Sequence, residues 1–367
     1  MVFLVLISVG SFVAKDREFS ENENRYLTQF PEISIDSILN CDFQDGLEKY
    51  INDQIWGRDE WITIKTAIQK FVGNTDIGGA YVGKDGYDFE KITQDDVDRK
   101  LVDRNIAQIQ EFFETASAKI DKSRLSFLLV PTSGLILADK LPANAPLFDQ
   151  TAIVEAVKQG MADYNFVDIR DVMTTHKEEY VYYRTDHHWT SYGALLAYGE
   201  YCQSIGLPFD EESFQEVVAA ENFRGSLYSK ILDYDSAYDI IKFYEKSGSA
   251  KSFVVTLDGE KTDGFYHYNR LEEKDKYLFF FGGNYAEVVI SKTSERAEKR
   301  NLLLIKDSFA NCFAPLVAED YDNIYMIDLR YFRGDMQEYM EANDITDVLV
   351  LYNVSNFISD KNIHKLN

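Results

Sequence analysis

The feature that most constrains the fold of this chain is an alternation of short apolar runs and helical patterns that begins near residue 124. The first run, 124–130, reads Arg-Leu-Ser-Phe-Leu-Leu-Val and stops at Pro131, which cannot donate to a strand ladder. Helical patterns separate it from further apolar runs at 165–169, 301–305, 323–329 and 347–352. Alternating strands and helices are typical of a mostly parallel sheet with helices on both faces. The sequence therefore predicts an α/β fold with three layers.

Apolar residues at helical spacing predict the helices of this fold. They occupy residues 42–71, 95–120, 151–164, 190–205, 308–319 and 335–342. Segment 209–300 has a different pattern, in which polar turns separate aromatic-rich runs at 240–244, 252–257 and 277–281. We interpret segment 209–300 as a β-rich insertion, and residues 78–87 as a short hairpin that turns at 84–86.

Residues 2–14 form an uncharged apolar run that three charged residues follow. A membrane-spanning helix needs roughly 20 apolar residues, so this run is too short to span a bilayer alone. It also lacks the basic start and the small-residue cleavage site of a complete signal peptide. We interpret residues 1–14 as a partial membrane anchor or signal segment, with an apolar first strand or helix of the domain as the alternative. Residues 15–367 are expected to form the domain itself.

Composition narrows the class of protein. Apolar residues make up 45% of the chain, which is enough for a large core and excludes global disorder. The formal net charge of −24 argues against a nucleic-acid partner, because neutralising phosphates requires a positive surface. The three cysteines, Cys41, Cys202 and Cys312, are widely spaced and include no Cys-x-x-Cys pair. They support neither a disulfide framework nor a zinc ribbon.

Ligands of open α/β sheets bind beyond the carboxyl ends of the strands. The strand predicted at 301–305 runs into Lys306-Asp307-Ser308 and then into a helix. A serine at such a turn has an exposed hydroxyl, and the helix N-terminus offers free backbone N–H groups to a developing oxyanion. Ser308 is therefore a candidate nucleophile. The alternative is an ordinary helix cap, because serine and aspartate are favoured at that position.

A second polar segment, 184–189, places two adjacent histidines after an acidic residue. His188 is a candidate general base because imidazole suits proton transfer near neutral pH. Asp186 stands two residues earlier, where it can hold the Nδ1 of His188 and fix its tautomer. Trp189 would supply an apolar wall or a platform for a sugar ring.

The same segment permits two other interpretations. Asp186, His187 and His188 together resemble a set of metal ligands. Adjacent residues rarely converge on one ion, however, and the sequence shows no second cluster of ligands, so no metal is predicted. The third interpretation is a buried polar knot that fixes the start of the next helix.

Two further strand ends carry polar residues. Asn353 follows the strand predicted at 347–352 and is a candidate oxyanion donor, or a turn residue. Arg330 and Tyr331 end the strand predicted at 323–329 and are candidates for binding a substrate carboxylate or hydroxyl, or for a surface ion pair. Nucleophile, base, orienting acid and oxyanion donors are the parts that an acyl-transfer site requires.

The bacterial DHHW protein family takes its name from a motif that resembles Thr185-Asp186-His187-His188-Trp189-Thr190 with Gly193. The resemblance extends over nearly the whole chain, through residues 19–25, 52–54, 58, 281–284, 305–311 and 327–331. The family is similar to the SGNH-hydrolase-like domains of alginate O-acetylation proteins. The resemblance therefore implies a flavodoxin-like SGNH α/β domain.

By this resemblance, Asp186 and His188 match an Asp-x-His pair and Ser308 matches the nucleophile. It implies transfer of an acetyl group from a donor to a surface polysaccharide on the extracytoplasmic face of a bacterial membrane. Such proteins commonly act with a membrane-bound O-acyltransferase, and no cofactor is expected. A carbohydrate acetylesterase with the same triad is one alternative, and a non-catalytic glycan-binding or assembly protein is another.

The chain departs from the wider superfamily in two places. Lys306 stands where the superfamily has a glycine. The oxyanion glycine has no clear counterpart, and Gly134 is the candidate for it. Asn353 matches the superfamily asparagine by its position at a strand end.

Overall fold

The computed structural model describes residues 2–246, 253–262, 264–292 and 299–367. An eight-stranded sheet with the order β11-β10-β12-β14-β13-β15-β6-β7 forms its centre. The parallel part consists of β6 (Leu125–Val130), β7 (Asn165–Val167), β13 (Asn301–Lys306), β14 (Asn323–Ile327) and β15 (Asp347–Asn353). Antiparallel pairings add β10 (Phe253–Leu257), β11 (Glu260–Thr262) and β12 (Glu287–Lys292). The predicted α/β fold with a mostly parallel sheet is confirmed.

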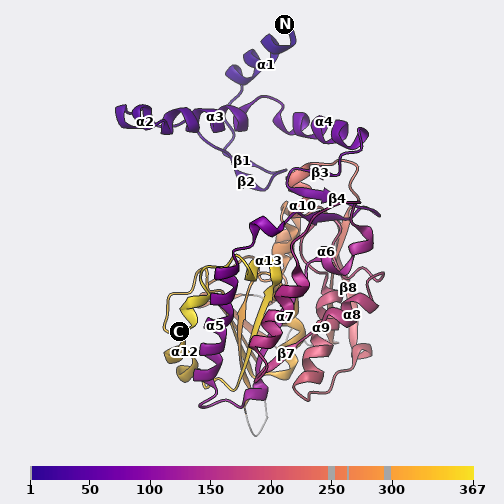
Figure 1. Ribbon diagram of the computed structural model, residues 1–367, viewed down its shortest axis with the longest axis vertical. Coiled ribbons are helices and arrows are strands. Elements are labelled where there is room, and N and C mark those ends of the chain that lie inside the picture. Colours follow the sequence, from indigo (N-terminus) through magenta and orange to yellow (C-terminus); the bar gives the residue numbers. More distant parts are fainter. Residues whose placement is uncertain (1, 247–252, 263, 293–298) are drawn as a thin grey trace.

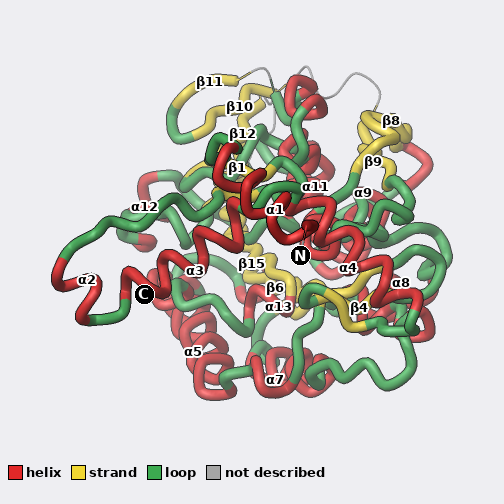
Figure 2. Tube along the Cα trace, turned by 90° about the horizontal axis from the view of Figure 1, so that it is seen from above, coloured by secondary structure: helices red, strands yellow, loops and turns green. Residues whose placement is uncertain are grey.

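Helices cover both faces of this sheet, as the view from above shows (Figure 2). One face packs against α5 (Arg99–Ala116), α7 (Gln150–Gly160) and α12 (Met336–Ala342). The other face packs against α9 (Ser191–Ser204) and α11 (Ala310–Val317). Successive strand residues point to opposite faces. In β13, Leu302 and Leu304 therefore lie in the core with α9, whereas Leu303 and Ile305 lie in the core with α5. The sheet and the helices packed on each of its faces are the three predicted layers.

The predicted helices are present, but several ends differ. The helix predicted from residue 95 begins at Arg99, because the Asp98 carboxylate caps it by accepting from two N–H groups of its first turn. The helix predicted at 42–71 is two helices, α3 (Asp42–Gln54) and α4 (Arg58–Phe71). Gly57 separates them with a φ of 71°, which suits glycine. The helix predicted from Ser308 begins at Ala310.

Segment 209–300 divides between two sheets. Strands β10 to β12 extend the main sheet, while β8 (Phe214–Phe223) and β9 (Asp239–Lys246) form a two-stranded sheet of their own. Of the strand predicted at 252–257, residue 252 lies outside the described residues. The aromatic-rich run at 277–281 does not form a strand of the segment interpreted as β-rich, because Lys276–Phe279 forms a 3₁₀ helix. A short run of aromatic residues has no periodicity that separates a strand from a buried helical turn.

The N-terminal part projects from the α/β body (Figure 1). It contains α1 (Val2–Val13), α2 (Ile35–Leu39), α3 and α4. Helix α4 contacts the body through Thr66, whose hydroxyl donates to the Ile231 carbonyl at 2.5 Å. Among the described residues, none of the helices has both the length and the apolarity that crossing a bilayer requires. The membrane anchor remains a prediction.

Smaller elements complete the edge of the sheet that carries the polar residues. The predicted hairpin is present as β4 (Ala80–Val82) and β5 (Asp88–Glu90), which pair around the predicted turn. The short helix α6 (Ser133–Ile136) follows β6, and α13 (Val354–Phe357) follows β15. Helix α10 (Ser226–Ile231) comes from the segment between β8 and β9.

Candidate active site

Ser308 lies just beyond the carboxyl end of β13, the neighbour of β14 and β15 in the sheet. The turn that carries it is held by the buried Asp307 carboxylate. This carboxylate accepts from the Phe309 N–H at 2.9 Å and from the Asn353 N–H at 2.7 Å. The Asn356 amide donates to it at 2.8 Å. Burial raises the pKa of Asp307, while these three donors act in the opposite direction.

The segment that carries His188 is fixed between β9 and α10. Asp239, the first residue of β9, accepts from the N–H and the hydroxyl of Thr185 at 2.8 and 2.5 Å. The Thr185 carbonyl accepts from the N–H groups of Leu227 and Tyr228 in α10, both at 3.0 Å. Two elements that are distant in sequence therefore hold this loop at the sheet edge.

The structure brings the three predicted triad residues together. The Nδ1 of His188 lies 2.6 Å from Oδ1 of Asp186, and its Nε2 lies 2.7 Å from Oγ of Ser308. An ionised carboxylate can only accept a hydrogen bond, so Nδ1 carries the proton. Nε2 is then an acceptor, and the Ser308 hydroxyl donates to it. This arrangement is what proton removal from a serine requires.

Asp186 is immobilised by further hydrogen bonds. Its Oδ1 also accepts from the His188 N–H at 2.9 Å, and its Oδ2 accepts from the Ser226 N–H at 2.8 Å. A Cβ at Gly225 would lie 2.3 Å from this Oδ2, so the close approach of the two chains requires glycine at 225. Gly225 and Ser226 therefore form the wall against which the orienting carboxylate rests.

Burial and charge set the protonation states of the pair. Burial acts to raise the pKa of Asp186, but the two histidine rings and the hydrogen bonds from His188 and Ser226 hold it well below its usual range. Burial lowers the pKa of His188 to about 4, and His187 adds to this effect while Asp186 opposes it. At neutral pH the imidazole of His188 is therefore uncharged and able to accept a proton.

Aromatic rings enclose the imidazole of His188. The Tyr277 ring is stacked on it, with centroids 3.9 Å apart and an interplanar angle of 11°. The His187 ring lies 3.9 Å away on centroids, and the Phe309 ring 4.7 Å away. The Tyr277 hydroxyl donates to the Ser308 carbonyl at 3.2 Å. Tyr277 thus links the imidazole of His188 to the turn that carries Ser308.

A cavity of about 270 Å³ opens at this site. Its volume is just under the range of about 300–1,000 Å³ that is typical of small-molecule sites. Its lining is polar and includes Asn24, Asp186, His187, His188, Arg224, Ser226, Lys274, Asp275, Tyr277, Asn284, Ser308, Asn311, Arg330 and Asn356. Three predicted site residues, Trp189, Tyr331 and Asn353, are absent from the described lining.

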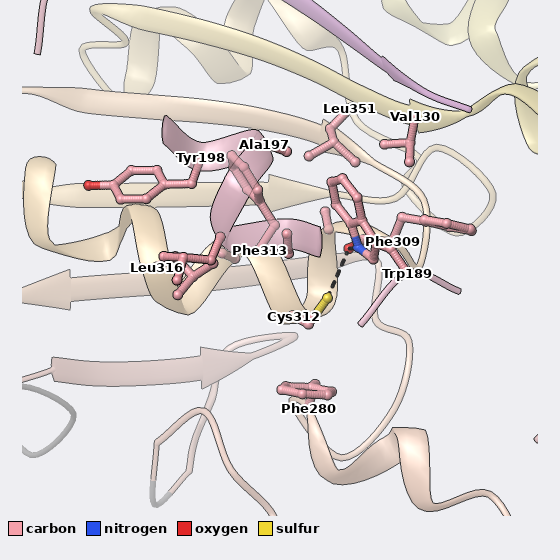
Figure 3. Packing of buried hydrophobic residues seen from close by; sticks show 14 of the residues in the cluster. Val130, Trp189, Ala197, Tyr198, Phe280, Phe309, Cys312, Phe313, Leu316 and Leu351 are labelled. Atoms are coloured by element: carbon pink, nitrogen blue, oxygen red, sulfur yellow. Dashed lines mark hydrogen bonds between the residues drawn. The ribbon is translucent and has the colours of Figure 1, made fainter. Parts of the chain in front are cut away.

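The position of Trp189 contradicts a role as a platform for a sugar. Its ring is fully buried between the sheet and α11, among Phe309 and Phe313 (Figure 3). Its indole N–H donates to the Phe309 carbonyl at 3.0 Å. Trp189 therefore fixes the backbone next to Ser308 from inside the core, because the side chain after His188 points away from the cavity.

The position of Asn353 contradicts a role as an oxyanion donor. Its side-chain oxygen caps α13 by accepting from the N–H of Ser355 at 2.9 Å. Its amide nitrogen donates to the carbonyls of Val130 and Pro131 at 3.1 and 3.4 Å. With its donors used in this way, the side chain joins the ends of β15 and β6. This agrees with the alternative interpretation of Asn353 as a turn residue.

The neighbouring candidates, Arg330 and Tyr331, differ from each other. Arg330 lines the cavity, but its guanidinium forms a bidentate pair with Asp328 at 2.6 and 2.9 Å. Tyr331 is exposed, and its ring lies 5.4 Å from the Arg330 guanidinium. Tyr331 is outside the described lining of the cavity. Substrate binding by Arg330 stays a prediction.

The structure also shows where Gly134 and Lys306 lie, the two positions at which the chain departs from the superfamily. Gly134 is buried in α6 and is not part of the described cavity lining. Lys306 is buried, and its ammonium donates to Oδ1 of Asn311 at 2.8 Å. Burial lowers the pKa of Lys306 to about 8. Lys306 thus holds Asn311, which lies in the first turn of α11 and lines the cavity.

Asp186, His187 and His188 remain the candidate metal ligands, because their ligand atoms lie within 4.8 Å of one another. Both ring nitrogens of His188 are hydrogen-bonded, and Nδ1 of His187 lies 2.6 Å from Oγ of Ser226. A metal ion would have to displace these hydrogen bonds. The donor set therefore fits the Ser-His-Asp arrangement better than it fits a metal centre.

Several lining residues escaped the sequence reasoning. Gly225, Ser226 and Tyr277 contact the triad from segment 209–300, which was interpreted only as β-rich. Asn284 belongs to the segment 281–284 that carries part of the family resemblance, and this was the one signal that singled it out.

Comparisons with known proteins agree with this fold. The family model described as DHHW protein matches residues 149–327, a range that includes all three triad residues. A DHHW family protein from Eubacterium siraeum is similar in structure, with a TM-score of 0.64 and 22% identity over 79% of this chain and 95% of its own. PatB1 from Bacillus cereus has a TM-score of 0.63 and 20% identity over 77% of this chain and 98% of its own. The predicted resemblance to the DHHW family is confirmed.

Two further results complete the comparison. The O-acetyltransferase domain of Pseudomonas putida AlgJ is similar with a TM-score of 0.49 and 15% identity, over 77% of this chain and 93% of its own. The similarity to the two proteins at 20–22% identity establishes a shared fold. No curated protein sequence matches the chain.

Proposed function

Residues 149–327 carry the pattern of the DHHW family, and we propose that this protein is an O-acetyltransferase that acetylates a cell-surface polysaccharide through Ser308, His188 and Asp186. The observation that carries the proposal is the continuous chain of hydrogen bonds from Asp186 through His188 to Ser308, at 2.6 and 2.7 Å. We assign the domain to the SGNH-hydrolase-like α/β folds.

The first half of the reaction acylates the enzyme. The Ser308 hydroxyl gives its proton to Nε2 of His188 while its Oγ attacks the carbonyl carbon of the acetyl donor. The tetrahedral intermediate then collapses, the bond to the leaving group breaks, and the leaving group takes the proton from His188. Asp186 stabilises the imidazolium that exists between these steps.

The second half transfers the acetyl group to the glycan. A sugar hydroxyl gives its proton to Nε2 of His188 and attacks the acetyl carbon on Ser308. The bond to Oγ breaks, and Ser308 recovers the proton. An ester on the sugar and a free serine result, so the atoms balance without a cofactor.

The negative oxygen that forms in each half needs hydrogen-bond donors. Within the described residues, the Ser308 N–H has no hydrogen-bond partner. The exposed Asn284 lines the same cavity, and its Oδ1 accepts from the Asn311 amide at 3.5 Å, which turns its own NH₂ group away from Asn311. We assign the oxyanion to the Ser308 N–H and the Asn284 amide.

The proposal sets the reaction on the extracytoplasmic face of a bacterial membrane. Residues 1–14 would then be part of an anchor or signal segment. A membrane-bound O-acyltransferase would supply the acetyl group, and a surface polysaccharide would receive it.

The test uses the full chain with p-nitrophenyl acetate as donor, with and without an oligosaccharide acceptor. We expect acetylated oligosaccharide, detected by mass spectrometry, and a loss of at least about 10³-fold in rate for Ser308→Ala. Ser229→Ala is the matched control, because Ser229 borders the same cavity but its hydroxyl donates to the Gly225 carbonyl. Phenylmethylsulfonyl fluoride should also modify Ser308; PatB1 of Bacillus cereus has been solved with a sulfonyl adduct.

The outcomes separate the alternatives. Free acetate without acetylated sugar would identify an acetylesterase with the same triad. Full activity of Ser308→Ala would exclude catalysis by this serine and leave a glycan-binding or assembly role.

A further inference from the structure

The charges around the cavity are unlike those of the chain as a whole. The chain has 38 Lys and Arg against 62 Asp and Glu. The cavity lining has three cations, Arg224, Lys274 and Arg330, against two carboxylates, Asp186 and Asp275. Asp186 is committed to the histidines, and Arg330 is paired with Asp328. Two cations, Arg224 and Lys274, and one carboxylate, Asp275, remain in the lining.

Arg224 is held in place by groups other than carboxylates in the described part of the chain. Its NH2 group donates to the carbonyls of Tyr234 and Ser236 at 2.9 and 2.6 Å. Its guanidinium lies 4.7 Å from the Tyr228 ring and 4.2 Å from the Tyr238 ring. Its Nε is buried and has no hydrogen-bond partner among the described residues. Carbonyl and aromatic groups therefore hold the side chain in place, and no carboxylate of the described residues is hydrogen-bonded to it.

Lys274 is a second cation held close to the first. Its ammonium donates to the Arg224 carbonyl at 3.1 Å and lies 4.2 Å from the same Tyr228 ring. No further hydrogen bond of this ammonium is present among the described residues, so two of its three donors are unused. Neither cation has an ion pair with a carboxylate in the described structure.

Burial lowers the pKa of Lys274 to about 8, and the charge of Arg224 lowers it further while Asp275 opposes this effect. The ammonium therefore stays largely protonated at neutral pH. Asp275 lines the same cavity, and the Asn24 amide donates to it at 3.4 Å. Burial, followed by the charge of Asp186, raises the pKa of Asp275 to about 6, so it is largely ionised at neutral pH and offsets one of the two positive charges.

Two cations that share a cavity wall with one carboxylate leave a net positive charge there, and a net positive charge stabilises a bound anion. We propose that Lys274 and Arg224 form a subsite for an acidic group, a carboxylate or a phosphate, on the glycan whose hydroxyl faces Ser308. Lys274 donates to the acidic oxygens with its two unused N–H groups, and Arg224 adds long-range attraction. This inference rests on the proposed function and narrows its acceptor to an anionic polysaccharide.

The test measures binding rather than turnover, so it does not depend on catalysis. Ser308→Ala is titrated by calorimetry with trigalacturonate, with its fully methyl-esterified form, and with an oligomer of glycerol phosphate. Esterification removes the charge but keeps the sugar hydroxyls. We expect at least about tenfold tighter binding of a charged ligand than of the neutral ester. This preference should weaken as salt is added.

Substitutions in the same background locate the preference. Lys274→Gln should reduce it to less than about twofold, and Lys274→Arg should keep most of it. Lys276→Gln is the matched control, because Lys276 lies two residues further along, outside the described cavity lining, and donates to the Leu271 carbonyl. Unfolding midpoints of all variants show whether each one is folded.

The arms of the experiment decide the result. Tighter binding of trigalacturonate assigns a carboxylate, and tighter binding of the glycerol phosphate oligomer assigns a phosphate. Equal binding of charged and neutral ligands, or a preference that survives in Lys274→Gln, overturns the subsite. A preference for anions in a protein that transfers no acetyl group would keep the subsite and overturn the proposed function instead.

Discussion

Two polar segments meet at the carboxyl edge of the sheet, and they use similar side chains differently. In segment 184–190, the buried imidazole of His188 hydrogen-bonds to Ser308, whose side chain lines the cavity. In segment 353–356, the side chain of Asn353 is equally buried, but its hydrogen bonds all go to neighbouring backbone and hydroxyl groups. The side chains of His188 and Asn353 are both buried and polar. They differ in that His188 hydrogen-bonds to a side chain that lines the cavity, whereas the hydrogen bonds of Asn353 stay within the protein.

This difference is what we use to tell a candidate catalytic residue from a structural polar residue. A buried polar group must be hydrogen-bonded wherever it lies, so satisfaction of its donors and acceptors says little about function. What marks the first segment is that its chain of hydrogen bonds ends on a hydroxyl that a ligand can reach. The second segment closes its chain within the protein, where it joins β15 to β6.

Asp186→Asn gives the largest expected effect in the first segment. An asparagine amide would donate to Nδ1 of His188 and so favour the tautomer with the proton on Nε2, which cannot accept the proton of Ser308. We expect kcat for p-nitrophenyl acetate to fall on the order of 10³–10⁴-fold. The unfolding midpoint should change much less than the rate. A fall of less than about tenfold would show that Asp186 does not orient the base.

Asn353→Ala should have the reverse effect. The substitution removes the cap of α13 and the bonds to the Val130 and Pro131 carbonyls. We expect the free energy of unfolding to fall by about 2–3 kcal/mol, measured by urea denaturation. The rate per folded molecule should stay within about threefold. A large loss of rate at unchanged stability would restore Asn353 as an oxyanion donor and remove the contrast between the segments.

The sequence predicted the sheet and the proximity of Asp186, His188 and Ser308 because local patterns encode much of both. Apolar runs of strand length mark β6, β13 and β15, and the strand ends point to Ser308. His188 and Asp186 stand two residues apart, so their contact needs little tertiary information. The contact of His188 with Ser308 depends on the fold. The alternation of strands and helices still predicts that both residues lie at the carboxyl edge of the sheet.

The predictions were wrong where the direction of a side chain depends on residues that are distant in the sequence. The sequence marks Trp189 as a neighbour of the base, but the packing of α11 decides that its ring lies in the core. Asn353 follows a strand, as a donor would, but the adjacent end of β6 takes its amide. Gly225 and Tyr277 approach the triad from a segment without strand-helix alternation. No local pattern records such long-range approaches.

His187→Gln is a smaller change that tests how the first segment sets its pH range. Catalysis needs neutral His188, so the rate should fall as the pH drops through the pKa of His188, about 4. His187 is one of the groups that lower this pKa, and its ring centroid lies 3.9 Å from that of His188. Removing it should raise the pKa and move the acid limb of kcat/KM to higher pH. Glutamine keeps a polar group beside the Ser226 hydroxyl.

The measurement is the profile of kcat/KM for p-nitrophenyl acetate from about pH 3 to about pH 8. His176→Gln serves as control, because His176 lies at the surface beside Glu179 and should leave the acid limb in place. Solvent and salt screen the effect of one charge on another over longer distances. If the acid limb of the profile moves in His187→Gln but not in His176→Gln, the group that titrates there is therefore His188. If the acid limb does not move in His187→Gln, the titrating group lies outside segment 184–190. The two polar segments would then differ in their hydrogen-bond geometry but not in the pKa of a histidine.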